Sequence, residues 1–189
     1  DLALMMRPTL TILDGGHILM KNGPTGGDPS NVKQGNTVAV GLDPVALDAE
    51  LKVDAIERAI TPRTKVLILN SPSNPSGAVY TRAELEALAA VAVKHQIHVL
   101  SDEIYERMIY GSARTAPFAS THPSAKARTI CVSGVSKTFS MTGWRIGYAA
   151  GPEAILRAMT NVQSQSTSNP TSISQVAAEA ALNGDQGCI

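Results

Sequence analysis

The chain has 189 residues, 43% of them hydrophobic, which suffices for one globular domain with a substantial core. Sixteen basic and sixteen acidic residues give zero net charge, which argues against nucleic acid or a membrane surface as an electrostatic partner. Two cysteines, Cys131 and Cys188, are too few for a disulfide framework, and the four histidines lack metal-site spacing, so we expect a small-molecule partner.

Residues 1–43 are the least regular part of the chain. Short apolar runs alternate there with Gly- and Pro-rich segments that are typical of loops, and a short strand is predicted over 38–43. The chain contains no apolar run of about 20 residues and no secretory signal pattern, so a cytoplasmic location is expected. It begins at Asp1 rather than Met and ends directly after a helix-like run, so we expect a fragment.

The first regular elements follow residue 44. Apolar spacing predicts a helix from Asp54 to Ile60, and KVLILN (65–70) reads as a buried strand of a parallel sheet. The next seven residues, SPSNPSG, form a rigid loop at the carboxyl end of that strand, where open α/β sheets place ligand-binding groups. Asn74 is the polar tip of this loop, and both ligand binding and simple helix capping remain open for it.

A second helix and strand repeat this arrangement. Thr81 and Glu84 have the spacing of a capping box, and the helix that follows places Leu85, Leu88, Ala89 and Ala92 inward. The strand IHVL leads into SDEIYE, where an acid can enter a pocket or merely turn the chain. Asp102 can pair there with a cation or a protonated heterocycle, and Tyr105 is expected to face the same cavity.

After a predicted surface connection (107–128), the stretch Thr129–Gly151 reads as a strand, a loop and a second strand. Lys137 lies in the loop, and a lysine becomes reactive in imine chemistry when its pocket favours the neutral amine. Arg145 can supply a nearby cation. Two more helices follow, over 152–165 and 171–182, and the alternation predicts an α/β fold with a mainly parallel sheet sandwiched by helices.

Three motifs in this order, SPSNPSG, SDEIYE and GVSKTFSMTGWRIGY, give the chain a family resemblance. From about residue 44 to 186 it resembles the class I/II aminotransferases, fold-type-I pyridoxal-phosphate enzymes, and is most similar to the bacterial aspartate and aromatic aminotransferase branch. The resemblance implies that 44–189 is part of the large coenzyme-binding domain, that the small C-terminal domain is absent, and that 1–43 departs from the family pattern.

The resemblance also implies roles around the coenzyme ring. Lys137 corresponds to the lysine that attaches to the coenzyme aldehyde and moves a proton at the substrate carbon. Asp102 corresponds to the acid that pairs with the pyridine nitrogen and keeps the ring an electron sink. Tyr105 and Asn74 correspond to the residues that hydrogen-bond the phenolic oxygen of the ring.

At the coenzyme phosphate, Arg145 corresponds to the clamping arginine, a task that suits a planar and permanently charged group. Ser136 is a second expected phosphate contact, although Gly134 occupies a position where some members carry the phosphate-binding serine. Three family parts are not found: an upstream Gly-rich phosphate site, expected before Asp1, an aromatic residue near 20–27, and the substrate-carboxylate arginine, expected after Ile189.

The resulting hypothesis is a pyridoxal-phosphate-dependent aminotransferase that moves an amino group between an amino acid and a 2-oxo acid, and the resemblance implies a homodimer. Two alternatives stay open. One is a carbon–sulfur lyase on the same coenzyme, which would use the same lysine, aspartate and arginine. The other is a truncated, non-catalytic coenzyme-binding module, for which the three family parts that are not found would not be needed.

Overall fold

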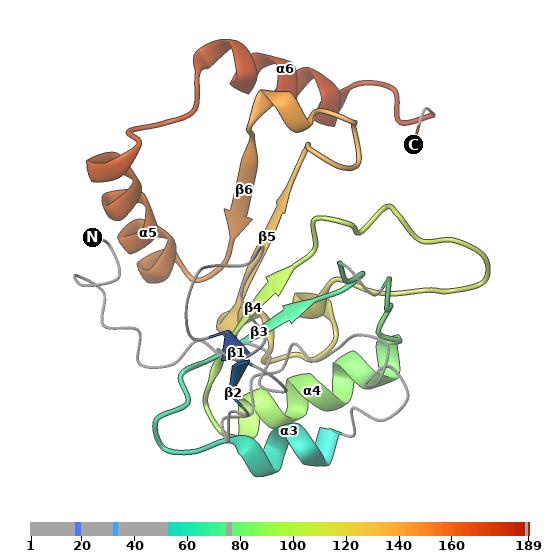
Figure 1. Ribbon diagram of the computed structural model, residues 1–189, viewed down its shortest axis with the longest axis vertical. Coiled ribbons are helices and arrows are strands. Elements are labelled where there is room, and N and C mark those ends of the chain that lie inside the picture. The colour runs from blue at the N-terminus through green and yellow to red at the C-terminus, as the bar shows by residue number, and fades with distance from the viewer. Residues whose placement is uncertain (1–17, 20–31, 34–52, 75–76, 188) are drawn as a thin grey trace.

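The structure is a computed structural model that describes residues 18–19, 32–33, 53–74, 77–187 and 189. Its centre is a four-stranded sheet in which the strands follow one another in chain order (Figure 1). These strands are β3 (Val66–Asn70), β4 (His98–Asp102), β5 (Thr129–Gly134) and β6 (Gly147–Ala150). A separate two-stranded pair joins β1 (Ile18–Leu19) to β2 (Val32–Lys33). The strand predicted over 38–43 and the expectation for residues 20–27 lie outside the described residues.

Three of the four central strands are parallel, as the strand–helix alternation predicts. β4 runs parallel to both β3 and β5, and β6 returns antiparallel to β5. The register pairs Asn70 with Asp102 and Asp102 with Val132, so the three parallel strands end at the same edge. The loops that follow these strands therefore begin side by side, which is the geometry of a ligand site in an open α/β sheet.

One face of the sheet is covered by α3 (Val53–Ala59) and α4 (Arg82–Lys94), which lie side by side in Figure 1. The alternating residues Leu67, Leu69 and Val99 of β3 and β4 point to these helices and form the main core with them. All four residues predicted to face inward on the second helix are buried there. Glu57 accepts hydrogen bonds from Lys94 and His95, which ties the two helices together at their surface.

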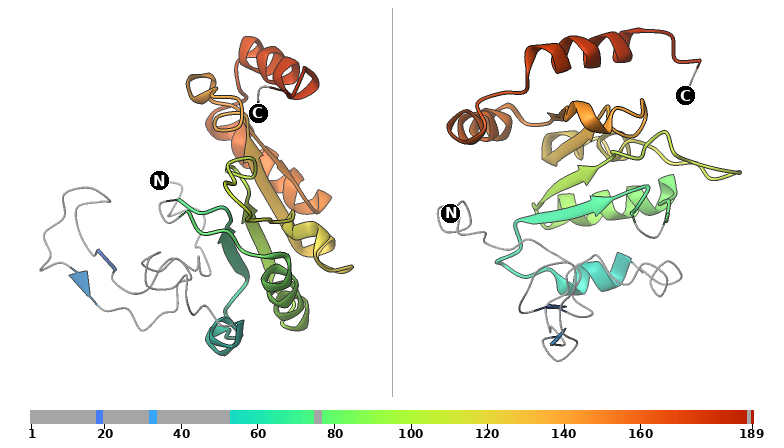
Figure 2. Two further views of the ribbon diagram at one scale, coloured as in Figure 1. Left: turned by 90° about the vertical axis from the view of Figure 1, so that its right-hand side faces the viewer. Right: turned by 45° about the horizontal axis from the view of Figure 1, so that its top comes forward.

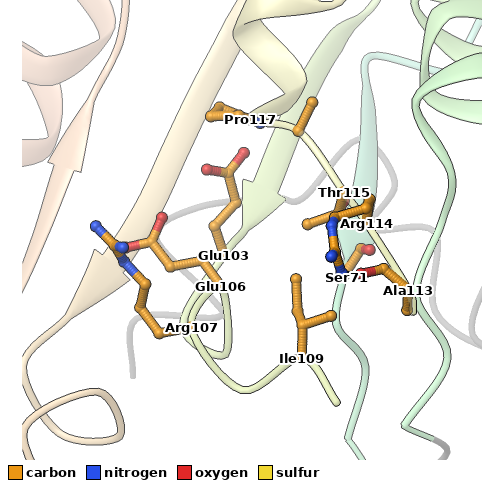
Figure 3. Close-up of a pocket in the computed structure, with 10 residues that line it drawn as sticks. Ser71, Glu103, Glu106, Arg107, Ile109, Ala113, Arg114, Thr115 and Pro117 are labelled. Carbon is orange, nitrogen blue, oxygen red and sulfur yellow. Dashed lines mark hydrogen bonds between the residues drawn. The ribbon is translucent and has the colours of Figure 1, made fainter. Parts of the chain in front are cut away.

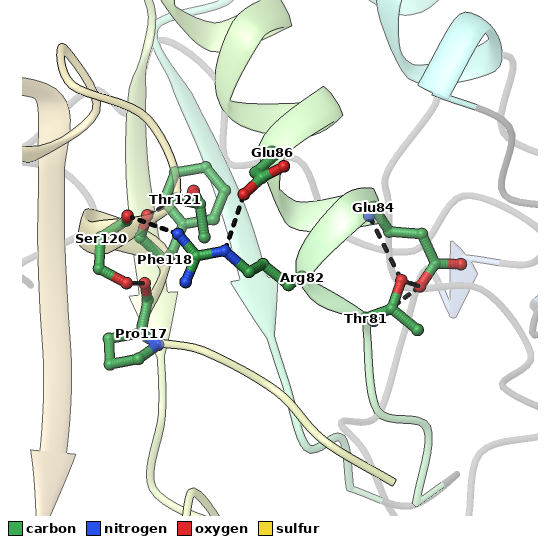
Figure 4. Close-up of polar contacts among 8 residues, drawn as sticks. All are labelled: Thr81, Arg82, Glu84, Glu86, Pro117, Phe118, Ser120 and Thr121. Carbon is green, nitrogen blue, oxygen red and sulfur yellow. Dashed lines mark hydrogen bonds and ion pairs between the residues drawn. The ribbon is translucent and has the colours of Figure 1, made fainter.

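The start of α4 is fixed by the predicted capping box (Figure 4). The Thr81 hydroxyl accepts a hydrogen bond from the Glu84 amide at 3.4 Å, and the Glu84 carboxylate accepts one from the Thr81 amide at 2.7 Å. These two bonds satisfy backbone donors that a helix N-terminus otherwise leaves unpaired. The sequence signal and the observed boundary agree at this position.

The connection over 107–128 is more than the surface segment that its composition predicts. It contains two short 3-10 helices, η2 (Phe118–Ser120) and η3 (Lys126–Arg128). Phe118 is only 1% exposed and joins the main core with Ala125. The prediction of a surface connection is therefore wrong for Phe118 and Ala125, because these side chains pack into the main core.

The C-terminal third follows β6. The 3-10 helix η4 (Thr142–Trp144) precedes that strand, and α5 (Glu153–Ser166) and α6 (Ser172–Asn183) come after it. Both views in Figure 2 place α5 and α6 on the β6 side of the sheet, opposite to α3. In α6, Ala178 packs on Val135 and Ile146 in a second small core, whereas no residue of α5 is buried. No helix in the described part of the chain is long and apolar enough to cross a membrane.

Candidate functional site

The carboxyl edge of the parallel strands carries a cavity of about 320 Å³. Its wall is formed by residues from the ends of β4, β5 and β6 and from the loop after β5: Asp102, Ile104, Val132, Ser133, Ser136, Arg145, Ile146 and Gly147. The volume lies at the lower end of the range of small-molecule sites. The cavity thus brings together three residues that the sequence predicts for one site, namely Asp102, Ser136 and Arg145.

Asp102 reaches this cavity because strand residues alternate between the two faces of a sheet. Val99 and Ser101 point to the helix-covered face, so Asp102 points to the opposite one. One carboxylate oxygen of Asp102 accepts a hydrogen bond from the Ile104 amide at 3.1 Å. The Asn70 side chain donates to the Asp102 carbonyl oxygen at 3.1 Å, which fixes the strand end. The carboxylate is half-buried and has lone pairs left to accept a ligand proton.

A second group of predicted residues meets beside the cavity. The side-chain amide of Asn74 donates to the Tyr105 hydroxyl oxygen at 3.0 Å, across 31 positions of sequence. The Lys137 ammonium lies 5.5 Å from the centre of the Tyr105 ring, at cation–π distance. Asn74, Tyr105 and Lys137 are not among the residues that line the 320 Å³ cavity, so the structure does not place Tyr105 on the wall of the cavity that Asp102 lines.

The loops that hold the two groups are short and braced by hydrogen bonds. The backbone amide of Asn74 donates to the side-chain oxygen of Asn70 at 3.0 Å, which folds the loop after β3 back onto its strand. After β5, the Phe139 amide bonds the Val135 carbonyl and the Ser140 amide bonds the Lys137 carbonyl, so Lys137 lies within a tight turn. Lys137 is half-buried there, three residues beyond the end of β5, as predicted.

Arg145 has an unusual backbone for a residue with a side chain. Its φ is +56°, in the left-handed region, and its guanidinium donates to the Thr142 carbonyl oxygen at 3.0 Å. A non-glycine residue in that region carries strain that the surrounding structure must hold in place, and such residues concentrate at functional sites. The guanidinium is exposed and retains donors for an anion at the cavity.

Gly134, the position at which some family members carry a serine, has a steric reason to be glycine. A Cβ at this position would lie 2.8 Å from the Ile146 carbonyl oxygen and 3.1 Å from the Gly147 Cα. Both contacts are to backbone of the paired β6 segment, so neither can move without disturbing the sheet. Among the predicted residues around the loop, the hydroxyl group on the cavity wall is therefore that of Ser136.

A second cavity, of about 360 Å³, lies on the other side of the strand end (Figure 3). Glu103, Glu106, Arg107 and Arg114 contribute to its wall. Burial and then repulsion from Glu103 raise the pKa of Glu106 above its ordinary value of 4.5. Sequence reasoning missed Glu103, although the period-2 alternation after Asp102 already indicates that it points to the opposite face.

Cys131 is a free thiol that donates a hydrogen bond to Glu103, on the wall of this second cavity, at 3.3 Å. Burial, followed by the charge and hydrogen bond of Glu103, raises its pKa to about 12. A thiol with this pKa stays protonated at neutral pH and is a poor nucleophile. In the described ranges, no group of three or more His, Cys, Asp and Glu residues is arranged to hold a metal ion.

Comparison with protein families gives two matches. The family described as "Aminotransferase class I and II" matches residues 35–188. A family described as "Domain of unknown function (DUF362)" matches residues 1–51. The first match contains every predicted site residue, and the two matches overlap over residues 35–51.

Individual relatives agree with the first match. An aspartate aminotransferase of Geobacillus stearothermophilus is 56% identical over 133 residues, which are 70% of this chain and 34% of that protein. An aspartate/prephenate aminotransferase of Nitrosomonas europaea is 54% identical over 141 residues, which are 74% of this chain and 36% of that protein. The chain thus spans about a third of the length of the curated relatives it matches.

The fold agrees as well. The crystal structure of an aspartate aminotransferase from Rhizobium meliloti superposes with a TM-score of 0.71 at 49% sequence identity. That match covers 74% of this chain and 35% of the other. An aromatic aminotransferase from Pyrococcus horikoshii gives a TM-score of 0.70 at 41% identity and covers 74% of this chain and 37% of the other.

Proposed function

The chain belongs to the class I and II aminotransferase family, and from this premise we propose that it is part of a pyridoxal-phosphate-dependent enzyme that transfers an amino group between an amino acid and a 2-oxo acid. The observation that carries the proposal is the convergence of two residue groups at one sheet edge. Asp102, Ser136 and Arg145 line the cavity, and the Asn74–Tyr105–Lys137 contacts lie beside it.

The donor set fits the chemical groups of this coenzyme. Pyridoxal phosphate has a basic ring nitrogen, a phenolic oxygen, an aldehyde and a phosphate, and when bound it supplies an electron sink for the substrate carbon. The half-buried Asp102 carboxylate suits a protonated ring nitrogen. The Arg145 guanidinium and the Ser136 hydroxyl suit the phosphate. The cavity is large enough for a molecule of this class.

Asn74, Tyr105 and Lys137 would act at the end of the coenzyme that carries the aldehyde and the phenolic oxygen. Because the Tyr105 oxygen accepts its bond from Asn74, the phenol proton remains to be donated to the phenolic oxygen of the coenzyme. Lys137 would form the covalent attachment through its amine and then move a proton at the substrate carbon. Its position over the Tyr105 ring keeps the amine close to that phenol.

Covalent capture tests the role of Lys137. The chain is mixed with pyridoxal phosphate, reduced with borohydride and digested, and mass spectrometry then locates the adduct. We expect it on Lys137, and we expect Lys137→Ala to lose it. Lys126→Ala, which changes an exposed lysine of η3, is the matched control and should keep it. An adduct spread evenly over several lysines contradicts the assignment.

Product analysis tests the reaction itself. Aspartate is the first amino donor to test, because two matched relatives carry it in their names. Transfer predicts a new amino acid formed from the 2-oxo acid acceptor. Release of ammonia without an aminated acceptor would instead favour a lyase, and coenzyme binding without either product would favour a non-catalytic module.

Two further assignments belong to the proposal. We propose residues 44–189 as part of the coenzyme-binding domain and 1–43 as a separate N-terminal part, which the different family matches at the two ends support. We also propose a homodimer. It is supported by the apolar surface of α6, where Ile173 is 74% and Val176 is 65% exposed. Sedimentation that gives only a monomer over a wide concentration range argues against it.

A further inference from the structure

Glu103 is a buried carboxylate that accepts its side-chain hydrogen bonds from neutral donors. It is 7% exposed, and its oxygen Oε1 accepts hydrogen bonds from the Ser101 hydroxyl at 2.8 Å and the Phe118 amide at 3.0 Å. Its oxygen Oε2 accepts one from the Cys131 thiol at 3.3 Å. The three donors belong to β4, η2 and β5, so one carboxylate connects three separate elements.

A buried carboxylate of this kind is energetically unfavourable relative to an apolar side chain. Burying a carboxylate costs free energy that neutral hydrogen bonds offset only partly, and buried acids usually have a cationic partner. Among the described residues, Glu103 forms no ion pair with a lysine, arginine or histidine. An apolar residue would fill the same core space without this desolvation cost, so the hydrogen bonds themselves are what distinguishes this position.

The backbone of Glu103 starts the turn that carries Tyr105. The Glu103 amide donates to the Val132 carbonyl at 2.8 Å, and the Glu103 carbonyl accepts from the Glu106 amide at 3.0 Å. The Met108 amide then donates to the Tyr105 carbonyl at 2.8 Å. The side chain of Glu103 thus anchors one end of a short turn, and the Tyr105 hydroxyl at the other end meets Asn74.

We infer that Glu103 is a positioning residue for the proposed coenzyme site: its buried carboxylate ties β4, η2 and β5 together, and so holds Asp102 and Tyr105 in their binding positions. Asp102 and Glu103 are consecutive and point to opposite faces of the sheet, so one side chain serves the ligand and the next one anchors the strand end. The inference rests on the proposed function only for the identity of the ligand.

The state of the thiol agrees with this role. Because the pKa of Cys131 is raised to about 12, the sulfur keeps its proton throughout the neutral range and remains a donor to Glu103. The anchor therefore keeps all three donors under the conditions in which the site would work.

Substitutions separate anchoring from general stability. In Glu103→Gln, the amide oxygen can accept the bonds from Ser101 and Phe118, and the amide nitrogen can donate to the Cys131 sulfur. Glu103→Ala loses all three bonds. Leu88→Ala, which removes a fully buried core side chain of α4, is the control for destabilisation away from the turn.

Hydrogen exchange of the chain without coenzyme tests the anchor directly. In Glu103→Ala we expect the Glu106 and Met108 amides to exchange on the order of tenfold faster than in Leu88→Ala, and Glu103→Gln to match the wild-type chain. Ser101→Ala removes a single donor and gives a smaller acceleration, which keeps the test open where Glu103→Ala does not fold. Equal acceleration in Glu103→Ala and Leu88→Ala, or loss of protection in Glu103→Gln, overturns the inference.

Coenzyme affinity supplies the second readout. We expect Glu103→Ala to bind pyridoxal phosphate about tenfold more weakly than Leu88→Ala, and Glu103→Gln to restore the affinity. Unchanged affinity in Glu103→Ala overturns the positioning role even where exchange is accelerated. If the wild-type chain takes up no coenzyme, the proposed function fails, whereas the exchange result still decides whether Glu103 anchors the turn.

Discussion

The left-handed backbone of Arg145 lowers the stability of the fold, whereas its side chain serves the proposed phosphate site. A non-glycine residue in this region costs about 1–2 kcal/mol relative to a right-handed one, and glycine removes that cost. We therefore expect Arg145→Gly to unfold at the same or a higher urea concentration than the wild type. Its free energy of unfolding should rise by up to about 1 kcal/mol. Its affinity for pyridoxal phosphate should fall at least about tenfold, because a charged hydrogen-bond donor is lost.

A matched control exists at Gln96, which has a φ of +54° just after α4 and away from the cavity. Gln96→Gly should change stability in the same direction and leave coenzyme affinity unaltered. Arg145→Lys should keep the strain and the charge but bind more weakly, because an ammonium lacks the planar fork. Equal affinity for Arg145→Gly and the wild type would exclude Arg145 from the phosphate site.

The raised pKa of Glu106 makes stability depend on pH. A raised pKa means that the folded chain binds the proton more tightly than the unfolded chain. Above the ordinary value of 4.5 the unfolded chain loses its proton first, so this group lowers stability as pH rises until the folded pKa is passed. Glu106→Gln should therefore be more stable than the wild type at pH 7, and this advantage should vanish below pH 4.5.

Urea unfolding from pH 4 to pH 8 measures the difference for Glu106→Gln. Glu179→Gln, on the exposed face of α6, is the control for losing one negative charge at the surface. A stability difference that is the same at every pH, or equal in the two variants, would show that burial beside Glu103 does not perturb Glu106.

At the scale of the strands, the β5–β6 pair depends on glycine. We expect Gly134→Ala to destabilise the chain by about 1–3 kcal/mol, because its Cβ would press on backbone atoms of the opposite strand. Gly143→Ala, in η4, meets no atom within 4 Å and should change stability by less than about 0.5 kcal/mol. Urea midpoints of the two variants, measured together, give the comparison.

The elements that were predictable are those specified by local pattern. The capping box at Thr81 marks the start of α4, and the apolar run before Asn70 gives β3, because backbone and side chain agree locally there. Phe118 and Glu103 were missed because their positions depend on residues far away in the sequence. An aromatic residue within a polar segment has no periodicity, and a buried acid resembles a surface acid until its donors are in place.

The site shows the same division. The motif order identifies Asp102, Ser136 and Arg145, and strand register then places them around one cavity. The sequence predicts that Tyr105 and Asn74 share a role, but not that they bond each other. That bond depends on the positions of two loops that are far apart in sequence. The left-handed φ of Arg145 had no sequence signal, because such a backbone is held by tertiary context rather than preferred by arginine.

At the scale of the whole molecule, the exposed stripe of α6 bears on association. We expect the double variant Ile173→Lys/Val176→Lys to reduce self-association, because it places charge on the most exposed apolar side chains of α6. Its free energy of unfolding should stay within about 0.5 kcal/mol per substitution, as is usual for exposed positions. Glu179→Lys, on another exposed part of the helix, is the control and should associate as the wild type does. Sedimentation at several concentrations measures the effect, and identical behaviour of all three chains would separate α6 from any interface.

The order of the central sheet has a consequence for synthesis. Each strand from β4 to β6 pairs with the strand made just before it, so a chain leaving the ribosome can add strands one at a time to a partner that is already present. Asn74, Asp102 and Lys137 then emerge in that order, and Arg145 comes last, two residues before the start of β6. A nascent chain that ends before Arg145 would already have its three parallel strands but would lack the Arg145 guanidinium, so we expect anion binding at the cavity only once the segment that leads into β6 has been made.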